Sequence, residues 1–175
     1  MAIKFFTGLA FSPLSKPKDE ETITLNCYKI SLRGTLICSG TALVSFIFNR
    51  FLAQEGAWKA LAPYVFTTSL FSCVTFAIFA ACISNKITKC VRAIRSDPGY
   101  DKSFNNTMSF VAKKSAQVGI IGAAAAFAFK YVTPNSLISS LAERSFSPFL
   151  GLGTAGSVLF IFHNRQQALM GKKHD

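Results

Sequence analysis

Four stretches of the sequence contain no charged side chain and are rich in apolar residues. A helix that crosses about 30 Å of hydrocarbon needs about 20 such residues, because each residue adds about 1.5 Å. Two stretches meet this length alone, and two meet it when flanking basic side chains extend to the lipid headgroups. The pattern predicts an all-α membrane protein with four transmembrane helices arranged as two helical hairpins. The stretches are 34–49, 60–85, 115–129 and 145–164.

The segments around these stretches predict one membrane domain at 30–165. Apolar residues recur at helical spacing from Ile83 to Ile94, so an amphipathic helix is expected to continue beyond the second stretch and to stop at Asp97-Pro98-Gly99. The expected parts are a cytoplasmic N-terminal tail at 1–29, partly disordered at 12–22, spans at about 32–52, 62–84, 114–132 and 147–164, a basic amphipathic cytoplasmic loop at 85–113, and a short C-terminal tail at 166–175.

Composition supports a membrane domain over a soluble one. The mean hydropathy is +0.35, half of the residues are hydrophobic and only 15% are charged, which is more apolar than an ordinary soluble domain. The alternative is a soluble bundle of four buried helices. A buried helix of that kind keeps one polar face, and the stretches at 60–85 and 115–129 have none.

The positions of the 19 basic residues favour one orientation in the membrane. Five precede or begin the first span, seven lie from Lys86 to Lys114 and three follow the fourth span, fifteen altogether, whereas the two turn loops hold the other four. Since short cytoplasmic loops carry the excess of Lys and Arg, we expect an integral, multi-pass protein with both termini in the cytoplasm. The two turn loops contain no cysteine, and cytoplasmic thiols stay reduced, so no structural disulfide is expected.

The net charge of +11 indicates a lipid partner before a nucleic acid. Basic residues at membrane boundaries attract anionic headgroups, and no basic run with interleaved aromatic residues lies outside the apolar stretches. A basic amphipathic helix in the middle loop would lie on a bilayer with an anionic inner leaflet. We therefore expect no nucleic-acid binding. The residues expected to contact anionic lipid are Lys86, Lys89, Arg92, Arg95, Lys113 and Lys114.

Small residues at i, i+4 spacing predict where the helices touch. In lipid, helices associate through close backbone approach at small residues. These contacts suffice for a bundle within one chain, and the additional small residues of the third and fourth spans leave open a homo-oligomer or contact with another membrane protein. The predicted packing residues are Gly34, Cys38, Ala77, Ala81, Gly119, Ala123, Gly151, Gly153, Ala155 and Ser157.

The sequence offers little for catalysis, cofactor binding or metal binding. No Asp, Glu, Lys, Arg or His lies at the middle of a span, where coupled transporters keep an ionisable group. His163 and His174 are too few and too far from acidic residues for a cluster, and His163 is expected at the membrane interface. Neither a phosphate-binding glycine loop nor zinc-ligand spacing occurs. We expect no enzyme, no cofactor and no metal.

Four functions fit this layout. The leading hypothesis is a non-enzymatic scaffold, adaptor or accessory subunit that works through helix packing. Two hairpins with a hydrophilic middle loop and both ends in the cytoplasm resemble the layout of reticulon-type curvature proteins, which implies membrane shaping. The paired hydrophobic hairpins also resemble the inclusion-membrane proteins that some intracellular bacteria export into host vacuoles, which implies a host-interface role. The fourth hypothesis is a small pore or holin-like oligomer.

Overall fold

Four long helices make up most of the described chain. The computed structural model describes residues 8, 10–52, 56–92, 98–133 and 137–171, and gives only the backbone of residues 52, 58, 88–92 and 98–101. The described residues contain no strand, and all four long helices are long and apolar enough to cross a membrane. The elements are α2 (Glu20–Ile47), continued by a short π-helix η1 (Phe48–Leu52), α3 (Ala57–Arg92), α4 (Pro98–Val132) and α5 (Leu137–Gly171).

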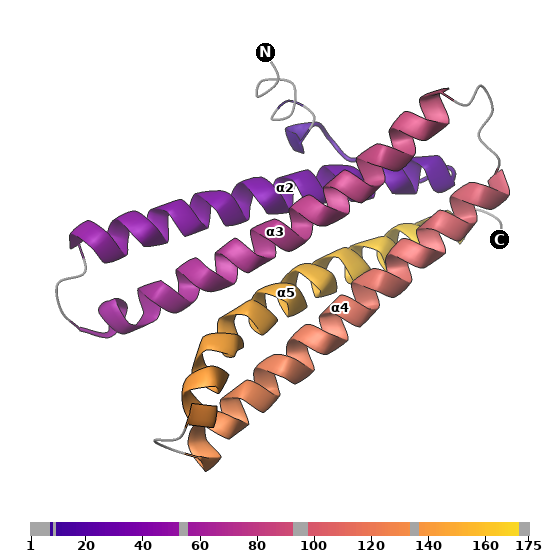
Figure 1. Ribbon diagram of the computed structural model, residues 1–175. Helices are drawn as coiled ribbons and strands as arrows, with labels where there is room; N and C mark the ends of the chain where they lie inside the picture. Colours follow the sequence, from indigo (N-terminus) through magenta and orange to yellow (C-terminus); the bar gives the residue numbers. More distant parts are fainter. Residues whose placement is uncertain (1–7, 9, 53–55, 93–97, 134–136, 172–175) are drawn as a thin grey trace.

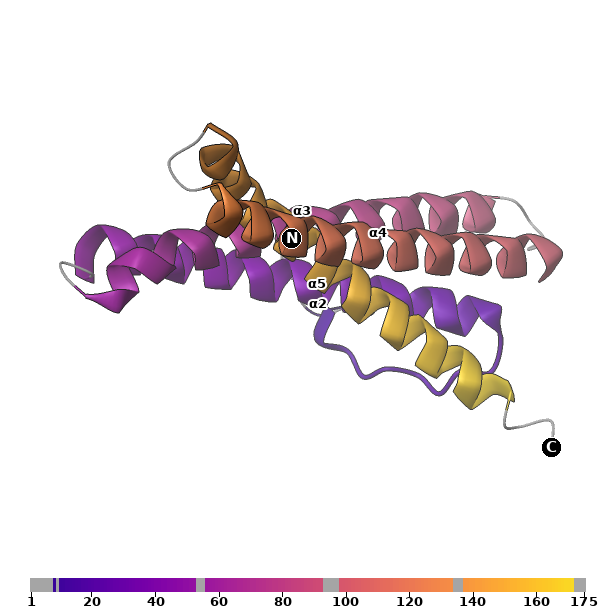
Figure 2. The same cartoon turned by 90° about the horizontal axis from the view of Figure 1, so that it is seen from below.

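The helices form two antiparallel hairpins, α2 with α3 and α4 with α5 (Figure 1). Both hairpin turns lie at one end of the molecule, which we call the turn end. The start of α2, the end of α3, the start of α4 and the end of α5 lie toward the other end, which we call the closed end (Figures 1 and 2). The hairpins separate toward the turn end, so the molecule is wedge-shaped.

The N-terminal boundary of α2 differs from the predicted tail. The helix begins at Glu20 because Asp19 caps it: Asp19 Oδ1 accepts hydrogen bonds from Thr22 N (2.8 Å) and Thr22 Oγ1 (2.6 Å). Two hydrogen bonds from Thr22 hold the pKa of Asp19 below its usual value. The bond from the side chain has the larger effect and the bond from the backbone the smaller. Residues 20–29 therefore belong to a helix and not to a disordered tail.

The middle loop also differs from its prediction. Residues 98–113 form the first half of α4, which begins at Pro98. Proline fits the first turn of a helix because its missing N–H would have no partner there. The same Pro-Gly pair that was expected only to end one helix thus begins the next. The expected stop of α3 at Asp97 lies outside the described residues, and α3 is described to Arg92.

Two adjoining apolar clusters form the core, and both lie in the half of the molecule nearer the closed end. The first gathers Ile23, Cys27, Tyr28, Ala80 and Ile83, and the second gathers Phe76, Phe79, Ala112, Ala155 and Leu159. All four helices contribute to them. The stretch at 98–113, predicted as a loop, supplies Ala112 and the partly buried Phe104 and Met108 that pack on these clusters.

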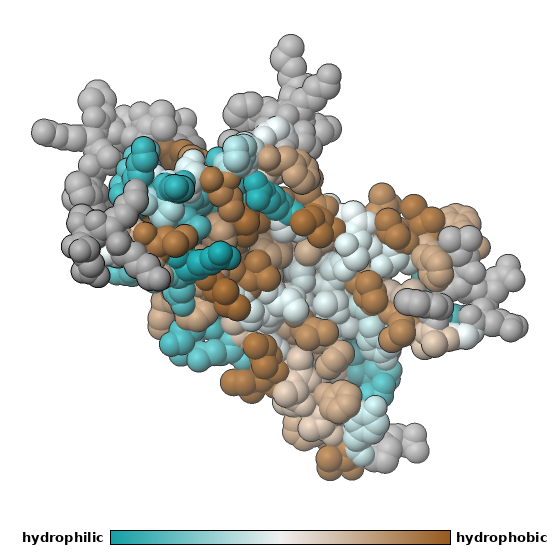
Figure 3. All heavy atoms as spheres, turned by 180° about the vertical axis from the view of Figure 1, so that it is seen from behind, coloured by the Kyte–Doolittle hydropathy of each residue, from teal (hydrophilic) through white to brown (hydrophobic). Residues whose placement is uncertain are grey.

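Large apolar side chains are exposed on all four helices. Figure 3 shows the side opposite to Figure 1: hydrophilic residues gather toward the closed end, and hydrophobic or neutral residues cover most of the rest. Exposed apolar surface of this extent is typical of a protein solvated by lipid. Examples, one from each helix in chain order, are Val44 at 66%, Ile78 at 58%, Ile121 at 67% and Ile161 at 65% exposure.

Hydroxyl groups within the apolar helices, such as those of Thr41 and Thr75, bond to the backbone of their own helix. Thr41 donates to Ile37 O (3.0 Å), and Thr75 donates to Phe71 O (2.9 Å). Such bonds allow a hydroxyl to lie in an apolar medium without an unsatisfied donor.

Candidate functional site: helix seams and two polar ends

The seam between α4 and α5 brings two backbones together at glycines. A Cβ built on Gly119 would overlap the backbone of Gly153, and one built on Gly156 would lie 2.6 Å from Ala116 N and 2.9 Å from Ala112 O. Because Cβ atoms essentially never come closer than 3.0 Å to a non-bonded heavy atom, only glycine fits at Gly119 and Gly156 without a shift of the helices. The seam is thus a small-residue contact of the kind that holds helices together in lipid.

A second seam joins the two hairpins, between α3 and α5. A Cβ on Gly151 would lie 2.6 Å from Thr68 O. At this point Ser72 Oγ donates to Gly151 O (3.0 Å) and lies 3.1 Å from Thr154 Oγ1. The helix α5 contains Pro148 just before this contact. The same helix therefore contributes to both seams. Close packing and an interhelical hydrogen bond therefore fix one hairpin against the other.

The contact between α2 and α3 is made differently. A Cβ on Gly34 would lie 2.6 Å from the ring of Phe76, a side chain, instead of from another backbone. Cys73 Sγ lies 3.6 Å from Thr35 O. The first hairpin thus uses a large side chain against a glycine, whereas the second combines such a contact, Phe149 against Gly122, with the backbone contact of Gly119 and Gly153.

The predicted packing residues fall into three groups. Within the chain, Gly119, Ala123, Gly151, Gly153 and Ala155 are buried, and Gly34, Cys38 and Ser157 are half-buried. Ala77 and Ala81 are exposed, because the side of α3 that carries Ser72, Phe76 and Phe79 faces the bundle. The two predicted packing residues of α3 therefore lie on the outer side of the helix.

The apolar half of α2 is covered much less than the other helices. Between Leu32 and Ile47 the only buried residue is Ala42. A Cβ built on Gly40 would meet no heavy atom within 4 Å. Gly40 is thus a glycine at the apolar centre of a helix with open space beside it, unlike Gly119 or Gly153.

The structure separates the residues predicted to contact anionic lipid. Lys113 and Lys114 are exposed. Lys86 is only 4% exposed, and its Nζ lies 4.4 Å from the centroid of the Phe104 ring, so this lysine does not lie on the surface as predicted. The first half of α4, predicted as a loop, supplies the ring that covers it. The side chains of Lys89, Arg92 and Arg95 lie outside the described residues.

A buried polar network joins three helices at the closed end. Thr24 Oγ1 of α2 donates to Asn105 Oδ1 of α4 (2.9 Å), and Asn105 Nδ2 donates to Glu20 O (2.9 Å) and Glu20 Oε2 (2.6 Å). Asn26 Nδ2 of α2 donates to Gln166 Oε1 of α5 (2.9 Å). Asn105 and Asn26 are 2% and 0% exposed. Such bonds tie the start of α2 to the second hairpin.

The segment before α2 runs back along that helix and is held by side chains of α2. Asn26 receives a hydrogen bond from Ser15 N (3.1 Å) and donates one to Ser15 O (2.7 Å). Lys29 Nζ donates to Pro13 O (3.0 Å), and Arg33 Nη2 donates to Ser12 O (2.6 Å). All of these hydrogen bonds are made to backbone groups of the segment. The backbone of the segment, more than its side chains, therefore holds it against α2.

The turn end has a different polar group beside a cavity of about 240 Å³. Lys130 Nζ of α4 lies 3.1 Å from Glu143 Oε1 of α5, and Tyr64 of α3 donates to the same carboxylate. The cavity is lined mainly by apolar side chains such as Leu61 and Phe127. The ion pair is partly exposed, so it positions the helices without adding much stability.

A small cavity of about 20 Å³ lies within the core, where all four helices meet. His163 lines it and is only 3% exposed, so its side chain faces the core, and its expected position at the membrane interface stays a prediction. The imidazole faces the core because the preceding residues of α5, from Gly151 to Leu159, present the same helix side to α3 and α4.

The sequence analysis missed the polar network because its members are far apart in the chain. A signal was present, since Asn26, Asn105 and Gln166 interrupt helical faces with side chains that need partners when buried. Nothing in the sequence pairs them. Comparison with protein-family models, with curated proteins and with solved structures finds no match to this chain, so its function is argued from the geometry.

Proposed function

We propose that this chain is a non-enzymatic, multi-pass membrane scaffold that holds a partner helix against its first hairpin. The observation that carries the proposal is the uncovered apolar half of α2, with open space at Gly40. In lipid, a glycine that no neighbour approaches offers a point at which another helix can pack closely. The partner is another membrane protein or a second copy of the chain.

The division between the hairpins supports this role. Gly119, Gly122, Gly153 and Gly156 of α4 and α5 are used within the chain, as are Gly151 against α3 and Gly34 against Phe76. The second hairpin therefore serves as a rigid support, and the first hairpin presents the free face. The sequence left open partner contacts through the additional small residues of the third and fourth spans, and the proposal assigns the partner contact to α2 instead.

The test compares one substitution with a matched control on the other hairpin. We expect Gly40→Leu to abolish co-purification of the partner after extraction in mild detergent. Ala124→Leu changes an exposed small residue of α4 and should leave the complex intact. Both variants should insert and elute as the wild type does. The proposal fails if Gly40→Leu retains the full complex on a native gel.

The proposal places both termini and the closed end in the cytoplasm. Fifteen of the 19 basic residues precede, separate or follow the hairpins in the way that the positive-inside bias favours. Ala57 is exposed at the turn end. In a chain without its native cysteines, Ala57→Cys should react with an impermeant maleimide from outside. Labelling only after the membrane is opened would overturn this orientation.

Membrane shaping is a second candidate function, favoured by the separation of the two hairpins toward the turn end (Figure 1). A wedge occupies more area in one leaflet than in the other and so favours curvature. Reconstitution into large liposomes at increasing protein content should then yield smaller vesicles or tubules by electron microscopy. Unchanged liposome diameters would leave only the scaffold function.

A further inference from the structure

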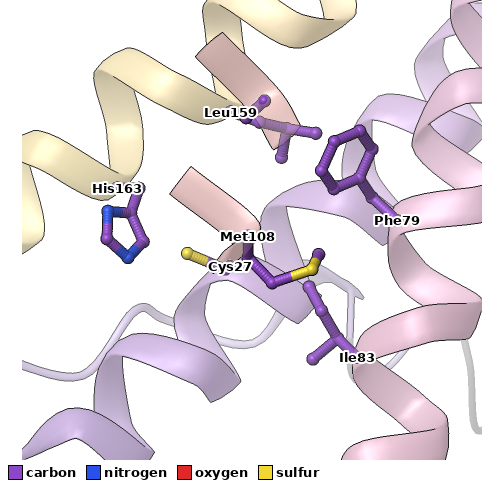
Figure 4. Close-up of a pocket in the computed structure, with 7 residues that line it drawn as sticks. Cys27, Phe79, Ile83, Met108, Leu159 and His163 are labelled. Atoms are coloured by element: carbon purple, nitrogen blue, oxygen red, sulfur yellow. The ribbon is translucent and has the colours of Figure 1, made fainter. Parts of the chain in front are cut away.

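The small core cavity is lined by an unusual set of donor atoms. His163 of α5, Cys27 of α2 and Met108 of α4 face it together with the apolar side chains of Phe79, Ile83 and Leu159 (Figure 4). The volume of about 20 Å³ admits one occupant of the size of a water molecule or a metal ion. Among the described residues, no carboxylate, lysine or arginine side chain lines this cavity.

His163 is the polar group that needs an explanation. It is 3% exposed, and neither Nδ1 nor Nε2 has a hydrogen-bond partner among the described residues. A buried imidazole normally has a partner for each ring nitrogen, because leaving a polar atom unpaired is unfavourable. A ring aimed into a cavity without a partner therefore indicates that the cavity takes a ligand.

The sulfur atoms indicate which ligand. Cys27 is a free, buried thiol, and its Sγ points toward the imidazole of His163 (Figure 4). Met108 lines the same cavity with its sulfur directed toward Ile83 and away from His163 (Figure 4), and methionine is flexible enough to turn its sulfur toward an occupant. A thiolate, a thioether and an imidazole together are the donors that soft, monovalent d¹⁰ ions such as Cu(I) prefer.

We propose that Cys27, Met108 and His163 form a binding site for one Cu(I) ion. On binding, the Cys27 thiol loses its proton to solvent and a Cu–S bond forms, so the copper stays Cu(I) and no electron is transferred. The thiolate and the ion together are neutral, which is the charge state that an apolar cavity tolerates. Zn²⁺ would bring one further positive charge and requires four ligands, for which the described residues have no group.

The experiment uses the full chain, purified in detergent under anaerobic reducing conditions, with Cu(I) supplied as its bicinchoninate complex. We expect one Cu(I) per chain. The variant in which Cys38, Cys73, Cys82 and Cys90 are all replaced by Ala should retain this stoichiometry, because the described lining of the cavity contains Cys27 and not Cys38, Cys73 or Cys82. Adding Cys27→Ala or His163→Phe should weaken binding at least about 10–100-fold, the range already seen for loss of outer-shell partners.

X-ray absorption on the copper-loaded wild type tests the ligands directly, so the result does not depend on whether the variants fold. The proposal predicts a Cu(I) edge with sulfur scatterers and one imidazole. Spectra with sulfur alone would exclude His163 and overturn the site. Loss of stoichiometric binding in the variant that keeps only Cys27 would overturn it as well, and would assign the copper to the other cysteines.

Discussion

Replacing glycines by alanine along the helix seams should give a graded loss of stability that the geometry ranks in advance. The series is Gly119→Ala, Gly156→Ala, Gly153→Ala and Gly40→Ala. At Gly119 a Cβ overlaps the Gly153 backbone, and at Gly156 it lies 2.6 Å from Ala116 N. At Gly153 the contacts are 3.0–3.3 Å, again with backbone atoms. At Gly40 there is no heavy atom within 4 Å.

Two opposing effects set the magnitude. Alanine in place of glycine favours a helix by about 0.5–1 kcal/mol, because the unfolded chain loses freedom. Overpacking costs about 1–3 kcal/mol and sometimes more, and backbone atoms cannot rotate away as a side chain can. The net effect should be a gain of up to about 1 kcal/mol at Gly40, near zero at Gly153, and a loss of about 1–2 kcal/mol at Gly156 and Gly119.

The assay is reversible unfolding in mixed detergent micelles, followed by circular dichroism. Each variant is compared with the wild type at equal micelle composition, and intact insertion is confirmed by size-exclusion chromatography. The reasoning about the α4–α5 seam is refuted if Gly119→Ala is as stable as Gly40→Ala. A loss at Gly40 comparable to that at Gly119 would instead show that the open face of α2 is occupied in the purified protein.

Three further predictions follow from the polar ends. Asn105→Ala should lower the free energy of unfolding by about 1–3 kcal/mol, because it removes both bonds to Glu20 and one of the two acceptors of the buried Thr24 hydroxyl; chemical denaturation measures this. The pKa of Asp19 is lowered in the folded state. Its capping contribution is therefore complete above the unfolded-state pKa of about 3.9 and is lost as the pH falls through the lower folded-state pKa. Amide exchange at the start of α2 should become faster over that range in the wild type and show no such step in Asp19→Ala. Lys130→Ala should leave the unfolding midpoint unchanged, since its ion pair with Glu143 is partly exposed; a large drop would show that the pair is desolvated.

The sequence was sufficient for the number and type of helices because apolar length alone decides them. The predicted spans at 62–84, 114–132 and 147–164 each lie within one helix of the structure, and the span at 32–52 covers the end of α2 and η1. The sequence was insufficient for the direction each helix faces. In a segment that is apolar all round, such as 60–85, no polar face marks the outside. The exposure of Ala77 and Ala81 therefore could not be predicted from the spacing of small residues.

The start of α4 at Pro98 explains why the burial of Lys86 and of His163 was not predicted. Residues 98–113 were assigned to a loop because they are more polar than the spans, although they contain apolar side chains such as Phe104 and Met108. As the first half of α4, this stretch covers Lys86 with the ring of Phe104, and its Met108 closes the cavity beside His163. Because the predicted fold lacked the first half of α4, it could not show that this helix covers Lys86 and His163.

Helix length shows how far each helix extends beyond a bilayer. The helices α3, α4 and α5 have 36, 35 and 35 residues, or about 53 Å each at 1.5 Å per residue. A hydrocarbon layer of about 30 Å leaves roughly 20 Å outside it. If the apolar stretches occupy the bilayer, the additional length of α4 is residues 98–114 at the closed end, whereas α5 extends beyond its stretch at both ends. The core clusters then cross the membrane boundary, because Phe79, Ala155 and Leu159 belong to the apolar stretches and Ile23 and Phe104 do not. Burial of apolar side chains drives association only where water is the solvent, so the contacts within the stretches must depend on close packing, as at Gly119 and Gly153.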